Sequence, residues 1–392
     1  MKQQRRRFST DEYKARQDKV RKAMEQRGLD LLIASDPSNM CWMTGFDGWS
    51  FYVHQCVVIG ADGELFWFGR GIDAPTAQIT TDLAEPDIIS YPDDYVMNPN
   101  QHPMEYLAGI LKEKGLQSMT IGVEMDNYYF SAKAMQSLAT ALTDATFVDA
   151  TALVNWQRAI KSAQELEYMR RAGKIIESVY KRIIDVARPG LRKNELIAEI
   201  QHAGILGSGD YFGDYTAIMP LIGVGEEAAA CHLTWDGEVL EKDTGMFLEL
   251  AGAHVRYHCP CSRTLYLGKP EQKYLDVEKI MHDCIDKTLE VFKPGNTCGE
   301  VAAVFFDNLE RSGYKKDNRC GYPIGLSYPP DWGERTMSLR RTDNTVLKEN
   351  MTFHFMPGLW FDNWGFEMTE SVVVTESGAE CLSRVPRKLL VG

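Results

Sequence analysis

The sequence predicts an α/β domain followed by an α+β domain. Two observations predict this: strands and helices alternate over about the first 150 residues, and the later helices come in pairs set apart from antiparallel-type strands. The length of 392 residues agrees with it, because domains average roughly 150 residues. We expect the boundary near residues 154–162, which gives domains of residues 1–157 and 158–392.

The first domain is predicted to open with a helix. Ser9-Thr10-Asp11-Glu12 has the form of a capping box, and this helix is expected to end near Gly28. The apolar run 31–34 that follows is a predicted strand. Further strands are expected over residues 54–59, 64–68, 119–123 and 146–149, and helices over 104–112 and 131–142. This order favours a sheet that is largely covered by helices.

The second domain is predicted to open with two helices, residues 163–186 and 193–206, separated by Arg188-Pro189-Gly190. Strands are expected over residues 216–222, 245–251 and 262–267, then helices over 271–292 and 298–312, then strands over 351–356 and 367–375. Cys259 and Cys261 are expected to be strand residues, because no second Cys or His pair stands at zinc-finger spacing.

Composition excludes several classes of partner. The net charge is −12, with 43 Lys and Arg against 55 Asp and Glu, which argues against nucleic acid and anionic membranes. No apolar run approaches the ~20 residues that span a bilayer. The basic N-terminal segment is not followed by the apolar run of a secretory signal. Nine irregularly spaced cysteines are typical of reduced thiols, so we expect a cytoplasmic protein.

Two residues are the first candidates for chemistry. Glu249 stands in an otherwise apolar strand, where a carboxylate is costly without a partner and acquires a raised pKa suited to acid/base or nucleophilic work. The alternative is an edge strand with Glu249 in water. His232 follows a run of small residues and precedes the turn Trp235-Asp236-Gly237. It is either delivered into a cleft or held as a hydrogen-bonded loop histidine.

Other candidates come from loops and from the last strand. The arginines at positions 335, 340 and 341 lie beyond the Gly/Pro-rich segment 321–325 and could bind a substrate carboxylate, although surface arginines are usually solvated. Glu367 and Glu370 lie three apart, hence on opposite faces of one strand, so at most one faces a given cleft. The aromatic segment 42–52 could wall a cation site, form a dimer interface, or do both.

These segments carry a family resemblance over essentially the whole chain. Residues 262–264 (SRT), 321–325 (GYPIG) and 351–358 (MTFHFMPG) resemble the pita-bread domain of creatinase, prolidase, aminopeptidase P and methionine aminopeptidase. Residues 36–39 and 44–50 resemble the smaller domain of the creatinase/prolidase branch. Within this superfamily, residues 231–235, 247–252 and 355–360 are most similar to ectoine hydrolases. The resemblance implies a creatinase-like N-terminal domain followed by a pita-bread catalytic domain.

The sequence departs from the family pattern at the positions that bind metal ions in the peptidases. In the peptidases of the superfamily, two metal ions are held by two Asp, one His and two Glu. Those positions fall on Glu249, Pro260, Tyr322, Met356 and Thr369, or on Glu370 if the last block slips by one. Since hard divalent cations need several oxygen or imidazole ligands, we expect no catalytic metal and no cofactor. Creatinase, which is metal-free, has its histidine at the position of His232, but its two glutamates fall on Ser262 and Met356.

The resemblance implies a small zwitterionic substrate, ectoine or also hydroxyectoine, opened to N-acetyl-diaminobutyrate. Glu249 would pair with the amidinium and activate water or attack the carbon, and His232 would carry the proton. Glu370 or Glu367 would be the second anion, and Arg340 would hold the substrate carboxylate. The remaining substrate-binding residues expected are Tyr322, Tyr215, His258, Phe46, Trp49 and Tyr52.

The creatinase branch also implies a homodimer in which the aromatic segment serves the neighbouring subunit's site. Three other interpretations stay open. One is a creatinase-like amidinohydrolase acting on another amidino or guanidino acid. The second is a metallopeptidase with rearranged ligands, and the third is a non-catalytic binding protein.

Overall fold

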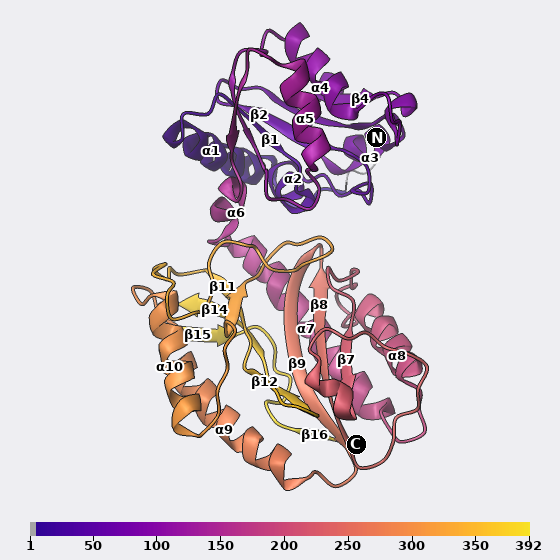
Figure 1. Ribbon diagram of the computed structural model, residues 1–392, viewed down its shortest axis with the longest axis vertical. Coiled ribbons are helices and arrows are strands. Elements are labelled where there is room, and N and C mark those ends of the chain that lie inside the picture. The colour runs from indigo at the N-terminus through magenta and orange to yellow at the C-terminus, as the bar shows by residue number, and fades with distance from the viewer. Residues whose placement is uncertain (1–4) are drawn as a thin grey trace. The chain divides into compact units, whose positions relative to one another are not determined.

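The computed structural model describes residues 5–392, and the chain divides into two compact units, the first ending at Arg158 and the second beginning at Ala159 (Figure 1). Each unit has its own hydrophobic core. The nine cysteines are all free thiols. Among residues 5–392, no helix combines the length and apolarity needed to cross a membrane.

The first unit is built on a six-stranded sheet of order β4-β3-β2-β1-β5-β6. Its strands are β1 (Leu31–Ala34), β2 (Cys56–Gly60), β3 (Leu65–Arg70), β4 (Ile88–Tyr91), β5 (Thr120–Val123) and β6 (Thr146–Asp149). Its helices are α1 (Thr10–Gln26), α2 (Pro37–Thr44), α3 (Ala74–Thr80), α4 (Pro103–Glu113), α5 (Ala132–Ala141) and α6 (Leu153–Arg158). β2 is antiparallel to β1 and β3, and the other neighbours are parallel.

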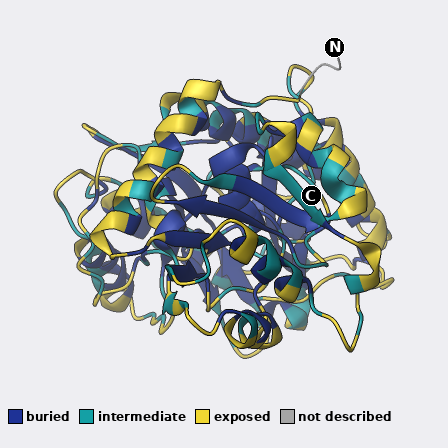
Figure 2. Ribbon diagram, turned by 90° about the horizontal axis from the view of Figure 1, so that it is seen from above, coloured by how far each residue is buried: buried dark blue, intermediate teal, exposed yellow. Residues whose placement is uncertain are grey.

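Helices cover both faces of this sheet, as the alternation of strands and helices predicts. In β1, Leu31 and Ile33 belong to the core formed with α4 and α5, whereas Leu32 and Ala34 belong to the core formed with α1, α2 and α6. Successive strand residues point to opposite faces, so a four-residue apolar strand requires cover on both sides. Figure 2 shows buried strands in dark blue and the outer faces of the helices in yellow.

The second unit contains two four-stranded sheets, of orders β16-β9-β8-β7 and β10-β11-β14-β15, and the pair β12–β13. Its strands are β7 (Leu221–Val224), β8 (Thr244–His254), β9 (Tyr257–Leu267), β10 (Gly321–Pro323), β11 (Thr352–Phe355), β12 (Gly358–Trp360), β13 (Gly365–Glu367), β14 (Glu370–Thr375), β15 (Gly378–Cys381) and β16 (Leu390–Val391). Its helices are α7 (Ala163–Val186), α8 (Lys193–Leu206), α9 (Gln272–Leu289) and α10 (Cys298–Arg311).

The long antiparallel hairpin β8–β9 is the central feature of this unit. Its register pairs Glu249 with Ser262 and Ala251 with Pro260. Helix α7 packs closely on the hairpin, since a Cβ at Gly252 would lie 2.2 Å from the carbonyl oxygen of Ala172. Glycine at position 252 therefore permits this close approach. Cys259 and Cys261 are buried residues of β9, as predicted.

The segment 367–375, predicted as one strand, is two strands interrupted at Met368 and Thr369. Glu367 ends β13, which pairs with β12, and Glu370 begins β14, which pairs with β11. At the break, the Thr369 backbone N–H donates to the Ser262 carbonyl oxygen on β9. The prediction of one strand was wrong because Met368 and Thr369 pair with β9 instead of continuing either strand.

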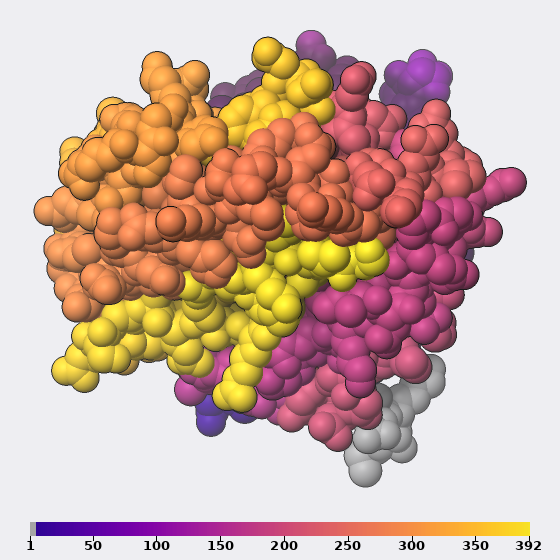
Figure 3. Space-filling model, turned by 90° about the horizontal axis from the view of Figure 1, so that it is seen from below, coloured from indigo at the N-terminus to yellow at the C-terminus, as the bar shows by residue number. Residues whose placement is uncertain are grey.

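The C-terminal segment forms hydrogen bonds with two helices of the second unit, α7 and α9. The backbone N–H of Arg384 donates to Glu177 of α7, and that of Leu389 donates to Glu278 of α9. Figure 3 shows this segment in yellow between the orange surface of α9 and the magenta surface of α7.

Candidate active site

Glu249 lies on β8, an inner strand of the sheet β16-β9-β8-β7. Strand β8 is paired on both sides at this residue, with Leu221 of β7 and Ser262 of β9, so β8 is not an edge strand here. The side chain is 5% exposed. Burial, and after it the nearby Asp331 carboxylate, raises the pKa of Glu249 to about 7 against the opposing effect of the Lys316 ammonium.

Glu367 is the second carboxylate of the site. It is fully buried, and burial, followed by the charge of Glu249, holds the pKa of Glu367 well above its usual range. The Ser262 hydroxyl and the Trp360 indole N–H lie close enough to favour its ionised form. Neither reaches it with hydrogen-bond geometry, and in the described part of the chain both carboxylate oxygens lack a partner. Because the two carboxylates lie close together in a buried site, ionisation of either one disfavours ionisation of the other.

Lys316 supplies a cation beside these carboxylates. Its ammonium donates to the carbonyl oxygen of Gly358 over 2.9 Å and lies 4.4 Å from the Trp360 ring centroid. Gly358 is the cross-strand partner of Glu367, which places Lys316 next to that carboxylate. Burial lowers the pKa of Lys316 to about 8 against the opposing effect of Cys320, Glu367 and Glu249.

Lys316 was not predicted from the sequence as a residue of the site. It lies in the polar stretch Lys315-Lys316-Asp317, which is typical of a solvated loop. Its neighbour Lys315 is indeed exposed. Only the close approach of this loop to β12 shows that one of the two lysines faces inward, and no local signal carries that information.

Tyr322 of β10 also belongs to the site. Its pKa is raised well above the usual range, first by burial and then by the charge of Glu249. Its hydroxyl accepts a 2.9 Å hydrogen bond from the Trp332 indole N–H and lies 2.9 Å from Nδ1 of His354. The predicted residues Glu249, Glu367 and Tyr322 are therefore brought together.

His232 does not lie where a strand would deliver it into a cleft. It is exposed, and its ring has no hydrogen-bond partner among residues 5–392. The preceding residue, Cys231, is half-buried, and burial together with Glu367 and Glu249 raises the pKa of its thiol. His232 thus follows directly on a residue of the carboxylate site without being packed into it.

Glu370 and Arg340 lie elsewhere. The expected role of Glu370 as second anion needs correction, because its buried carboxylate accepts from Arg263 over 2.8 Å and from Arg387 over 3.1 Å. Two guanidinium groups already neutralise it. Arg340 is exposed, and within the described chain its side chain forms no hydrogen bond or ion pair.

His258 is engaged by the backbone. Its Nε2 accepts the Ala217 N–H over 2.9 Å, so its Nδ1 carries the proton and donates to the Arg256 carbonyl oxygen, also over 2.9 Å. Burial lowers the pKa of this histidine to about 4. Both ring nitrogens are used, which corrects the expectation that His258 binds substrate.

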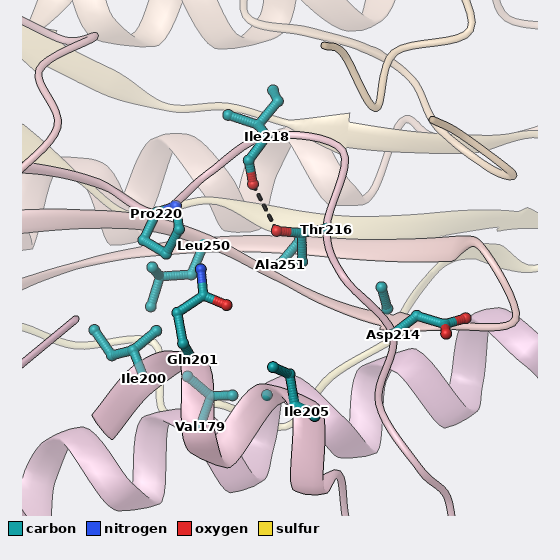
Figure 4. Close-up of a pocket in the computed structure, with 12 residues that line it drawn as sticks. Val179, Ile200, Gln201, Ile205, Asp214, Thr216, Ile218, Pro220, Leu250 and Ala251 are labelled. Carbon is teal, nitrogen blue, oxygen red and sulfur yellow. Dashed lines mark hydrogen bonds between the residues drawn. The ribbon is translucent and has the colours of Figure 1, made fainter. Parts of the chain in front are cut away.

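Tyr215 lies against Arg256, whose guanidinium is 3.8 Å from its ring centroid, and lines a cavity together with Gln201 and Trp235. An adjoining pocket at the edge of β8 is lined by residues of α7, α8 and the loop before β7 (Figure 4). Glu249 and Glu367 line neither of these two cavities. Tyr215 is therefore not among the residues gathered around the carboxylate pair.

The three aromatic residues predicted from the first unit differ in exposure. Phe46 is a core residue, 1% exposed and packed on Trp67 with ring centroids 5.2 Å apart, which corrects its assignment to a substrate site. Trp49 and Tyr52 are 59% and 61% exposed. Trp49 packs on Phe51 with ring centroids 4.6 Å apart, and the Tyr52 hydroxyl accepts a hydrogen bond from Arg70 over 3.3 Å.

The site does not have the donor set of a two-metal centre. At the positions that the resemblance assigns to ligands, Pro260 and Met356 offer no oxygen or imidazole. The Thr369 hydroxyl is occupied by the Ser262 N–H and by His354. Within residues 5–392, the one group of three or more acidic, His or Cys side chains able to share an ion is Glu227, Asp236 and Glu238. The Lys193 ammonium already bonds all three carboxylates.

Comparisons with known proteins agree with this architecture. Ectoine hydrolase of Halomonas elongata is 52% identical over 391 residues, 98% of each chain. An uncharacterised hydrolase/peptidase of Sinorhizobium fredii is 40% identical over 98% of each chain. The crystal structure of a prolidase from Thermococcus sibiricus matches with a TM-score of 0.84 at 17% identity, covering 98% of this chain and 100% of that one.

The family comparisons cover both units. The model of the creatinase/prolidase N-terminal domain matches residues 16–160, and that of metallopeptidase family M24 matches residues 167–376. The predicted creatinase-like domain and pita-bread domain are confirmed. The chain therefore belongs to metallopeptidase family M24, with a creatinase/prolidase N-terminal domain ahead of the M24 domain, and it is a hydrolase.

Proposed function

We propose that this hydrolase opens the cyclic amidine ring of ectoine to N-acetyl-L-2,4-diaminobutyrate without a metal ion. The observation that carries the proposal is the charge pattern of the site: two buried carboxylates, Glu249 and Glu367, beside one ammonium, Lys316. Ectoine carries a delocalised cation and a carboxylate, so its charges complement this pattern. The 52% identity with an ectoine hydrolase over 98% of both chains supports the same substrate.

The chemistry needs an anion, a nucleophile and a proton donor. An amidinium carbon is already electrophilic, so it does not need the Lewis acid that a peptide carbonyl can require. Glu249 pairs with the amidinium and either takes a proton from the attacking water or attacks the carbon itself. If Glu249 attacks, the water that adds afterwards displaces it, so the bond between the carbon and the Glu249 oxygen breaks and the carboxylate is regenerated. After water has added, the carbon–nitrogen bond breaks, its electron pair stays on nitrogen, and that nitrogen gains a proton. His232, on the neighbouring exposed loop, is the proposed proton carrier.

Lys316, rather than the exposed Arg340, is the proposed partner of the substrate carboxylate, and this sets a pH dependence. Glu249 must be ionised, so kcat/KM should rise with pH up to about 7. Lys316 must be protonated, so kcat/KM should fall above about pH 8. In Lys316→Met the falling limb should disappear, and the rising limb should move to higher pH because the ammonium no longer lowers the pKa of Glu249.

Initial rates between about pH 5 and 10 measure both limbs. Lys315→Met is the matched control, because Lys315 is exposed, and it should keep the profile of the unsubstituted enzyme. A Lys316→Met profile identical to that control would contradict the assignment.

We propose further that the enzyme acts as a homodimer in which Trp49 and Tyr52 serve the neighbouring subunit's site. Their exposure as large aromatic side chains supports this, because such groups are enriched at interfaces. Sedimentation velocity should give the mass of two chains. Mixed Trp49→Ala and Glu249→Gln subunits should regain activity that neither variant has alone, whereas a monomeric, active enzyme would contradict the proposal.

The substrate is tested by incubating the purified enzyme with ectoine, hydroxyectoine and creatine separately and following each by proton NMR. We expect ring opening of ectoine with appearance of the N-acetyl product. Turnover of creatine alone would favour the amidinohydrolase alternative. Binding of ectoine without turnover would favour a non-catalytic binding protein.

A further inference from the structure

A continuous buried hydrogen-bond chain connects Tyr322 to the backbone of β9. The Trp332 indole N–H donates to the Tyr322 oxygen over 2.9 Å, and Nδ1 of His354 lies 2.9 Å from the same oxygen. Nε2 of His354 lies 2.8 Å from the Thr369 hydroxyl oxygen, which also accepts the Ser262 N–H over 2.7 Å. His354 and Thr369 are fully buried, whereas Tyr322 is 7% exposed.

The proton count of this chain allows two arrangements. His354 is neutral, because burial lowers its pKa to about 3, so its ring carries one proton. If that proton is on Nδ1, it is donated to Tyr322 and the Thr369 hydroxyl donates to Nε2. If it is on Nε2, Tyr322 donates to Nδ1 and the Thr369 hydroxyl proton must find another acceptor.

Burial decides between the two arrangements. In the second arrangement the hydroxyl proton of Thr369, a fully buried side chain, has no further acceptor in the described chain. An unpaired buried donor is strongly disfavoured. In the first arrangement the surplus proton is on Tyr322, the one member of the chain that is slightly exposed and lies near Glu249.

We infer that Tyr322 is a catalytic hydrogen-bond donor whose hydroxyl proton points into the site, and that His354 is the positioning residue that keeps it there. Two N–H groups occupy the lone pairs of the Tyr322 oxygen, so its own proton can only be donated outward. The acceptor is the oxygen that water delivers to the amidine carbon, where negative charge develops as that oxygen becomes the amide carbonyl. This role rests on the proposed function.

The kinetic test uses single and double variants. Tyr322→Phe should lower kcat for ectoine by about 10²–10³-fold, as for the loss of one preorganised donor, with little change in KM. His354→Gln should also lower kcat, and the double variant should be no worse than Tyr322→Phe, because His354 acts through Tyr322. Full additivity of the two losses, or a Tyr322→Phe enzyme within about twofold of normal, would overturn the inference.

A second measurement does not depend on turnover. Histidine labelled with nitrogen-15 reports the tautomer of His354, and its signals are assigned by their loss in His354→Gln. We expect the Nδ1–H tautomer, unchanged between about pH 6 and 9. The Nε2–H tautomer would overturn the inference whatever the substrate proves to be. An Nδ1–H tautomer in an enzyme that leaves ectoine intact would instead contradict the proposed function and leave the hydrogen-bond arrangement standing.

Discussion

Glu249→Gln is expected to lower kcat for ectoine by about 10²–10⁴-fold, the contribution typical of a general base. Glutamine keeps the shape of the side chain but cannot take a proton from water or attack the amidine carbon. The same substitution at Glu367 should weaken ectoine binding, because the second carboxyl group beside the amidinium can then no longer ionise when the cation binds. Initial rates followed by NMR or by amine release measure both effects.

Stability separates a catalytic role for Glu249 from a structural one. Burial raises its pKa in the folded state to about 7, so the folded protein loses stability as the carboxyl ionises above its unfolded pKa. At pH 8 the neutral Gln variant should therefore melt no lower than the unsubstituted enzyme. Glu226→Gln, at an exposed residue, is the control and should keep full activity. An active Glu249→Gln enzyme would refute the assignment.

Glu370→Gln should behave in the opposite way, with lower stability and near-normal kcat per folded molecule. The Glu370 carboxylate is buried between Arg263 and Arg387, and Arg263 is fully buried. Removing one partner of a buried ion pair costs about 3–5 kcal/mol, because a charge is left without compensation. For a unit of this size the melting temperature should fall by roughly 6–20 °C.

A neighbouring exposed pair supplies the control for that prediction. Glu380 of β15 pairs with Arg170, and both side chains are about two-fifths exposed. Glu380→Gln should cost at most about 1 kcal/mol. If Glu370→Gln instead kept its melting temperature and lost most of its kcat, then Glu370 would be the second catalytic anion and Glu367 would not.

The helices and the long strands could be predicted from local patterns. Helices α7 and α8 have the predicted bounds, because amphipathic periodicity, a capping serine at 162 and the Pro-Gly stop all lie within the segment itself. The burial of Glu249 agrees with the apolar character of its strand, since residues 245–254 of β8 are all buried. These features depend on near neighbours in the sequence, which a single chain displays.

The features that were missed depend on distant segments. The break between Glu367 and Glu370 arises where Thr369 pairs with β9, more than a hundred residues earlier. The ion pairs of Glu370 come from Arg263 and from the C-terminal segment. Lys316 is drawn inward by the carbonyl oxygen of Gly358. None of these pairings leaves a local periodicity, so alternation alone could not decide which glutamate faces Glu249.

The family resemblance predicted the family of both domains, which local patterns could not. The positions where the sequence departs from the family concern the metal ligands. Metallopeptidase family M24 and the creatinase/prolidase N-terminal domain are confirmed for the chain. At the ligand positions, Pro260 and Met356 cannot bind a hard cation, and the structure adds an ammonium, Lys316, beside the two carboxylates that remain. Such a cation competes electrostatically with a bound metal ion.

The metal-free mechanism is tested most directly by following ring opening of ectoine with enzyme that has been dialysed against a chelator. The metal content of the enzyme is measured alongside. We predict the same kcat before dialysis, after it, and in the continued presence of the chelator. Loss of turnover on dialysis, with recovery when a divalent ion is returned, would contradict the metal-free mechanism and would reopen the interpretation as a metallopeptidase with rearranged ligands.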